Sequence, residues 1–117
     1  MGNVADASAK RHFPGWKTIK ADDGYVFTAP VGQFQPNAFG LHDMHGNAWE
    51  WCQDKYDSNY YRNSPRKDPQ GPGAGADRVF RGGSWYDEPR ICRSAFRHRI
   101  EPSYRSAAIG FRVVCVR

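Results

Sequence analysis

Among the large apolar side chains of this chain, aromatic rings outnumber aliphatic groups. The chain holds four Trp, six Tyr and seven Phe, against a single leucine at position 41. So few aliphatic residues cannot fill a conventional layered core, but each buried aromatic ring removes a large area from water, so a handful can build a small one. Twelve glycines and eight prolines cut the aromatic residues into short segments. We therefore expect one domain over residues 1–117, of the α+β class, rich in loops and poor in regular secondary structure.

The first half of the chain contains few segments with a clear pattern. Residues 1–24 are polar with isolated apolar residues, which predicts a loop with one short helix. Residues 25–31 have a β-rich composition, and Pro30 limits them to an edge strand or a strand end. Trp49 and Trp51 alternate with Glu50, which predicts a strand with both indole rings on one face and the carboxylate on the other.

The second half alternates loops with strand-like segments. Residues 57–77 contain repeated Pro and Gly and predict a surface loop. Residues 78–85 predict a strand that meets a glycine pair, where two backbones approach closely. Residues 91–98 are compatible with either a short strand or a helical turn. Residues 110–117 alternate in the manner of a half-buried terminal strand.

The net charge is +5, and arginine dominates after residue 78. These arginines are interspersed among strand-like and aromatic residues without a helical basic stripe or a zinc-finger spacing, so we expect them to pair with carboxylates and carbonyls and not with nucleic acid. No apolar run is long enough to cross a membrane, and the first residues have no signal-peptide core. We expect a soluble domain and leave its compartment open.

Two carboxylates lie seven residues apart around a glycine turn, at Asp43 and Glu50. Calcium takes six to eight oxygen ligands that a loop can wrap around the ion, so this spacing suits a calcium site. The alternative is that Glu50 pairs with one of the many arginines while Asp43 caps a turn.

Three segments in the same order and spacing resemble the sulfatase-modifying-factor family, to which formylglycine-generating enzymes belong. They are NAFGLHDMHGNAWEW from Asn37, RVFRGGSW from Arg78 and GFRVV from Gly110, with CRSAFR from Cys92 between the last two. The resemblance covers essentially the whole chain and corresponds to the C-terminal part of the family's domain. It implies a loop-rich variant of the C-type-lectin architecture that binds several calcium ions.

The resemblance also implies two sets of structural calcium ligands. The first set is Asp43 and Glu50 through their side chains, with Met44, Gly46 and Ala48 through backbone carbonyls. The second set is Asn3 and Asp23 through their side chains, with Val4 and Tyr25 through backbone carbonyls. Bound calcium would tie loops together in a chain that has little apolar area to bury.

The family's oxidases use a pair of cysteines that bind Cu(I), and this chain departs from that pattern. Cys92 matches the second cysteine, whereas Asp87 occupies the position of the first. A carboxylate is a hard ligand that replaces a soft thiolate poorly, so we do not expect copper binding. Ser84 matches a position near the family's active site. We expect Cys52 and Cys115 to be packed, and the spacing of the histidines does not indicate a metal site.

Three functions follow from these residues. The chain is expected to be a calcium-stabilised domain of this family that lacks the oxidase activity. The first alternative is an active formylglycine-generating oxidase, or a fragment of one, acting on sulfatase cysteines. The second is a lectin-like binding module whose loops at 57–77 and 87–90 recognise a ligand. The expected partner is a peptide or protein ligand, or a chain that supplies the N-terminal half, and neither nucleic acid nor a membrane.

Overall fold

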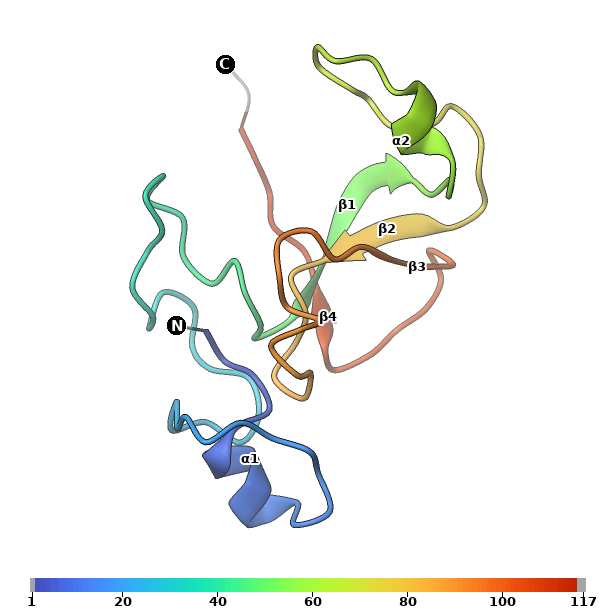
Figure 1. Cartoon of the computed structure of the whole chain (residues 1–117). Coiled ribbons are helices and arrows are strands. Elements are labelled where there is room, and N and C mark those ends of the chain that lie inside the picture. The colour runs from blue at the N-terminus through green and yellow to red at the C-terminus, as the bar shows by residue number, and fades with distance from the viewer. Residues whose placement is uncertain (1, 116–117) are drawn as a thin grey trace.

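The computed structural model describes residues 2–115 and contains a small sheet between two short helices (Figure 1). Its elements in chain order are α1 (Ala7–His12), β1 (Trp49–Lys55), α2 (Tyr60–Asn63), β2 (Arg78–Arg81), β3 (His98–Ile100) and β4 (Ile109–Gly110). Helix α1 lies at one end of the molecule and α2 at the other. Most of the described chain is loop, as the glycine and proline content predicts.

The four strands form one mixed sheet in the order β3-β2-β1-β4. Strand β2 pairs antiparallel with β1 on one side and with β3 on the other. Strand β4 pairs parallel with β1, so that Trp49 is opposite Ile109 and Glu50 is opposite Gly110. The ladder between β1 and β2 is irregular between Trp51 and Lys55. The central pair β1 and β2 therefore fixes where the other two strands attach.

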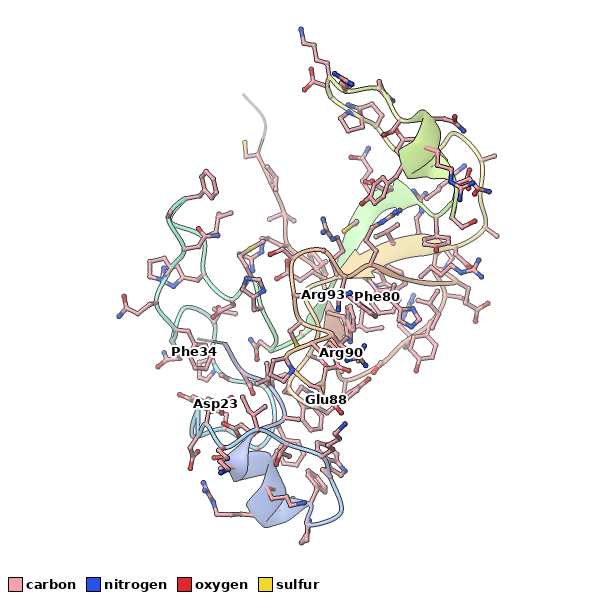
Figure 2. The ribbon with its side chains drawn as sticks, viewed as in Figure 1. Asp23, Phe34, Phe80, Glu88, Arg90 and Arg93 are labelled. Carbon is pink, nitrogen blue, oxygen red and sulfur yellow. The ribbon has the colours of Figure 1, made fainter. Side chains whose placement is uncertain are left out.

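The two tryptophans of β1 lie on one face of the sheet, as their alternation predicts. Their rings meet Phe80 of β2 at centroid distances of 4.7 Å for Trp49 and 5.7 Å for Trp51. Phe80 lies near the middle of the molecule (Figure 2). Glu50 points to the opposite face, where its carboxylate accepts from Arg112. We call these the tryptophan face and the glutamate face.

The N-terminal segment is buried in the middle of the fold. Residues 3–6 are all buried. Asn47 N donates to Asn3 O at 2.7 Å, and Ala5 N donates to Asp87 O at 3.0 Å. The Asp6 carboxylate caps the start of α1 by accepting from Ser8 N at 2.8 Å, so the short helix predicted within residues 1–24 is confirmed. This segment therefore joins the loop before β1 to the loop after β2.

Two expected strands are wrong or misplaced. Residues 25–31 form turns and loop, because the Asn47 side chain takes the place of a neighbouring strand: Oδ1 accepts from Ala29 N at 2.8 Å and Nδ2 donates to Ala29 O at 3.2 Å. Residues 91–97 are turns and loop, and the strand in that region is β3. By contrast, β2 followed by the left-handed pair Gly82 and Gly83 confirms the strand and close approach predicted for residues 78–85.

The expected half-buried strand at 110–117 is also wrong. Strand β4 ends at Gly110, and the following segment runs away from the sheet (Figure 1). Phe111 and Val113 are 77% and 82% exposed, and Cys115 is exposed as well. Within residues 2–115 no strand pairs with 111–115, so the apolar alternation has no surface to cover. Residues 116 and 117 lie outside the described part. No helix in that part is long and apolar enough to cross a membrane.

Candidate functional site

The residues of the second expected ligand set meet around the Asp23 carboxylate. Asp23 lies in the loop that follows the helix (Figure 2). Its carboxylate accepts from Val4 N at 3.1 Å and from Tyr25 N at 2.8 Å, so the structure brings together all the residues of this set. Asn3 is 0% exposed, and its Oδ1 atom is buried without a hydrogen-bond partner. An amide oxygen buried without a partner costs free energy unless something else binds it, and calcium suits an oxygen of this kind.

Asp23 stands in a negative environment. Burial raises the pKa of its carboxyl, and the charges of Asp6 and Asp22 raise it further, while backbone hydrogen bonds lower it. Asp22 itself is held by Arg11 and Ser8, whose hydrogen bonds lower the pKa of Asp22 to about 2. A cation bound beside Asp23 would offset the cost of keeping that carboxylate charged.

The first ligand set is only partly assembled. Asp43 has a left-handed backbone with φ of 57°, and its Oδ2 accepts from Gly32 N at 2.7 Å. Its Oδ1 is buried without a hydrogen-bond partner. The Glu50 carboxylate, however, is gripped by Arg112, with Nη2 to Oε1 at 2.7 Å and Nε to Oε2 at 3.0 Å. The alternative that Glu50 pairs with an arginine is thus confirmed, and Glu50 is committed to that ion pair.

Two buried side-chain oxygens, one in each expected ligand set, have no hydrogen-bond partner. Over residues 2–115, Asn3 Oδ1 and Asp43 Oδ1 are the buried side-chain polar atoms that lack a partner, and each belongs to one expected calcium set. The same residues contain no group of three or more His, Cys, Asp or Glu side chains that could hold a metal ion. Each expected site combines one or two carboxylates with backbone carbonyls, and the second adds the Asn3 amide, so these two oxygens fit such ligation.

Asn47 joins the two sets and was not identified from the sequence. Besides its bonds to Ala29, its Oδ1 accepts from Asn3 Nδ2 at 3.3 Å, and its backbone O accepts from Trp85 N at 3.0 Å. Its φ is 68°, a left-handed conformation that asparagine tolerates better than most residues. The Gly46-Asn47 pair indicated a turn, which is correct, but the sequence carries no sign that the amide binds segments 18 and 44 residues away.

Gly46 allows close contact between residues 2–4 and residues 45–47. A Cβ at this position would lie 1.9 Å from Asn3 O, and one at Gly2 would lie 1.8 Å from His45 O. The backbones of residues 2–4 and 45–47 are therefore in direct contact. This contact borders both expected ligand sets.

The oxidase-related residues form a closed turn. Ser84 is 0% exposed, and Asp87 Oδ2 accepts from Ser84 N at 2.9 Å and from Ser84 Oγ at 2.6 Å. The hydroxyl thus bonds a carboxylate of its own turn. Asp87 is held in place by these bonds and is not directed towards a ligand.

Cys92 is buried and chemically quiet. Its exposed fraction is 3%, and its Sγ lies against Gly83, where an added Cβ would be 2.3 Å away. Burial, together with the charge of Asp87, raises the pKa of the Cys92 thiol to about 12. The thiol is therefore protonated at neutral pH and is a poor nucleophile. Its partner position holds the hard carboxylate of Asp87, which is bound to Ser84, so the residues present fit a Cu(I) site poorly.

The other cysteines and the histidines do not add a reactive cluster within the described residues. Cys52 is half-buried, and burial raises its pKa while the nearby charges of Arg81 and Arg97 lower it. Cys115 is exposed, which corrects the expectation that it is packed. His42 Nδ1 bonds Phe34 O and His45 Nδ1 bonds Cys92 O, so each imidazole meets a backbone carbonyl.

Comparison with known proteins agrees with this architecture. The family profile described as "Sulfatase-modifying factor enzyme 1-like domain" matches residues 1–116. The formylglycine-generating enzyme of Streptomyces coelicolor is 46% identical over 95 residues, covering 79% of this chain and 30% of that protein. A Chlamydia pneumoniae protein named serine/threonine-protein kinase pkn1 is 39% identical over 109 residues, covering 89% of this chain and 18% of that protein.

Solved structures show the same fold. PvdO from Pseudomonas aeruginosa superposes with a TM-score of 0.70 at 30% identity, over 92% of this chain and 50% of that one. Treponema denticola variable protein 1 superposes with a TM-score of 0.67 at 38% identity, over 73% of this chain and 31% of that one. These structures define a class of loop-rich proteins built around a small mixed sheet. The chain belongs to the sulfatase-modifying-factor family, and it spans about a third or less of the curated relatives quoted above.

Proposed function

We propose that this chain is a calcium-stabilised domain of the sulfatase-modifying-factor family that binds a peptide or protein partner and does not oxidise cysteine to formylglycine. The observation that carries the calcium part is the pair of buried, unpartnered oxygens, Asn3 Oδ1 and Asp43 Oδ1. Each stands in one of the two ligand sets that the family resemblance implies. Because Arg112 already holds Glu50, we give more weight to the second set.

The residues that would hold the ion in the second set are Asn3 and Asp23, with the carbonyls of Val4 and Tyr25. Calcium there would supply electrostatic stabilisation only, by binding oxygens that the fold has buried. In the first set, Asp43 would contribute its free Oδ1 beside the carbonyls of Met44, Gly46 and Ala48, and Glu50 would have to exchange its bond to Arg112 for the ion.

Calcium is expected to raise the melting temperature of the protein. A ligand at 100 times its Kd stabilises the folded state by about 2.7 kcal/mol, which for a domain of this size corresponds to a rise on the order of 10 °C. The measurement is a melt followed by circular dichroism in calcium and in EDTA. Asn3→Ala should reduce the calcium-induced shift, whatever its effect on the melting temperature in EDTA.

Asn63→Ala is the matched control, because Asn63 is an exposed asparagine on α2, far from both sets. It should keep the full calcium-induced shift. A wild-type protein that melts at the same temperature in calcium and in EDTA would contradict the calcium proposal.

The proposed lack of oxidase activity rests on the buried, protonated Cys92 and on the carboxylate of Asp87 at the position of its partner. A peptide bearing the Cys-x-Pro-x-Arg motif, mixed with the protein and Cu(I), is expected to gain no aldehyde detectable by mass spectrometry. Aldehyde that forms with the wild-type protein and disappears in Cys92→Ser would favour the active oxidase instead.

A further inference from the structure

The positive charge of this chain is concentrated in one part of it. Residues 53–117 carry thirteen Lys and Arg against seven Asp and Glu, a net charge of +6. Residues 1–52 carry four Lys and Arg against five Asp and Glu, a net charge of −1. The basic excess therefore lies in the part that supplies β2, β3 and β4, and not in the part that supplies all of the expected calcium ligands.

Four arginines of this part belong to the glutamate face of the sheet. Arg99 is opposite Val79 in the β2–β3 ladder, so both point to one face, and Arg81 follows Val79 by two residues. Arg81 is opposite Glu50, which contacts Arg112. Arg97 lies just before β3, and it shares the Tyr56 ring with Arg99. We call these four residues the arginine row. It follows the strand order from β3 to β4, a width of about 14 Å at about 4.8 Å per strand.

Two members of the row are already compensated and two are not. Arg112 pairs with Glu50, and Arg99 Nη1 lies 3.3 Å from Asp77 Oδ2. Among the described residues, Arg81 and Arg97 form no ion pair. Arg81 donates from Nη2 to the backbone carbonyl of Ser94, which orients its guanidinium without cancelling its charge.

Arg97 is held by aromatic rings. Its guanidinium carbon lies 4.3 Å from the centroid of the Tyr61 ring and 5.4 Å from that of Tyr56. Arg99 also lies over Tyr56, at 4.8 Å. A guanidinium stacked on a ring keeps its N–H edge available for a carboxylate, and its preorganisation reduces the entropy lost on binding.

A cavity of about 360 Å³ adjoins the row at the β1 and β4 side. Its lining combines apolar groups with charged ones at one edge: Met44, Trp51, Cys52 and Val114 are apolar or weakly polar, and Glu50, Arg81 and Arg112 are charged. Arg81 and Arg112 thus belong both to the row and to the cavity. A ligand that reaches from the cavity to Arg97 would need an apolar group at one end and anionic groups along its length.

We propose that the glutamate face binds an extended acidic peptide segment, with an apolar side chain in the cavity and carboxylates on Arg81 and Arg97. This deepens the partner part of the proposed function and does not depend on calcium. A peptide fits better than nucleic acid because the arginine row offers two guanidiniums without an ion pair beside a partly apolar cavity, whereas nucleic acid calls for a longer track of phosphate contacts.

The probe is a fluorescein-labelled octapeptide of alternating Glu and Val, compared by fluorescence polarisation with the same peptide carrying Gln in place of Glu. We expect the acidic peptide to bind and the neutral peptide to bind at least about tenfold more weakly, since the carboxylates supply charge-assisted hydrogen bonds. Arg81→Gln and Arg97→Gln should each weaken binding of the acidic peptide about tenfold.

Arg66→Gln is the matched control, because Arg66 is an exposed arginine of the 57–77 loop outside the row and its loss changes the net charge equally. It should change the affinity less than about twofold, as a distant surface charge does in buffered salt. Circular dichroism checks that each variant is folded, and Arg97→Lys, which retains the charge but loses the forked edge, gives an independent variant expected to lose affinity.

Equal loss of affinity in Arg66→Gln and Arg97→Gln would overturn the proposal, as would equal binding of the neutral peptide. Tighter binding of a twelve-residue oligothymidylate than of the acidic peptide would identify the face as a nucleic-acid surface instead. Each titration is run in calcium and in EDTA. Equal peptide affinity in calcium and in EDTA is expected, because this face does not depend on calcium, and the calcium proposal is judged separately by the melting temperatures.

Discussion

Gly46→Ala is expected to leave most of the protein unfolded at 25 °C. An added Cβ would lie 1.9 Å from Asn3 O and 2.9 Å from Val4 Cγ1, and the φ of 82° is unfavourable for alanine. The nearest atom belongs to backbone, which cannot rotate away as a side chain would. Overpacking and a left-handed alanine together cost about 4 kcal/mol or more, which approaches the whole stability of a small domain.

The measurement is urea unfolding followed by far-UV circular dichroism, with Gly40→Ala as the matched control. Gly40 has a similar φ of 76°, but nothing lies within 4 Å of its added Cβ. It should lose only the backbone contribution, about 1 kcal/mol. If both variants lose the same free energy of unfolding, the contact between residues 2–4 and 45–47 does not limit this position.

Asn47→Ala should have the next largest effect, a loss of about 3 kcal/mol in the free energy of unfolding. The substitution removes the buried partners of Ala29 N and Ala29 O, and one of the two acceptors of Asn3 Nδ2, which keeps Phe27 O. A buried donor or acceptor left without a partner costs more than the bond itself contributes. It also places alanine at a φ of 68°.

Asn37→Ala is the matched control for Asn47→Ala, because it removes side-chain hydrogen bonds that are exposed instead of buried. Asn37 Oδ1 accepts from Phe39 N at 2.9 Å and from Leu41 N at 3.1 Å, but these bonds are exposed, so water can replace them. Its loss should be under about 1 kcal/mol in the same urea titration. A loss as large as that of Asn47→Ala would show that the burial of the Asn47 amide is not the source of its effect.

Local patterns predicted the parts of the fold that local physics controls. The alternation of Trp49, Glu50 and Trp51 fixes which face each side chain takes, because successive residues of a strand point to opposite sides. The glycine pair after β2 predicted a close approach, and Gly83 indeed packs against Cys92. The strand expected over residues 25–31 failed because its backbone partner is a side chain, Asn47, 18 residues from Ala29 in the sequence.

The sequence predicted which residues belong to the candidate site but not the contacts that they make. The resemblance supplied Asn3, Asp23 and Asp43, and the structure adds that oxygens of Asn3 and Asp43 are buried without partners. That Arg112 takes the Glu50 carboxylate depends on the parallel pairing of β4 with β1, 62 residues away, which no spacing rule gives. The burial that keeps Cys92 protonated likewise depends on its packing against Gly83.

The central position of residues 3–6 also has a kinetic consequence. Their backbone bonds reach Asn47 and Asp87, so the contacts that close the fold join positions far apart in the sequence. Closing such long loops costs chain entropy before any contact repays it, and folding rates fall as the sequence separation of contacts grows. On a ribosome, residues 3–6 emerge well before Asp87 and must wait for it before they can form these bonds, so the domain is expected to fold late and in a single step.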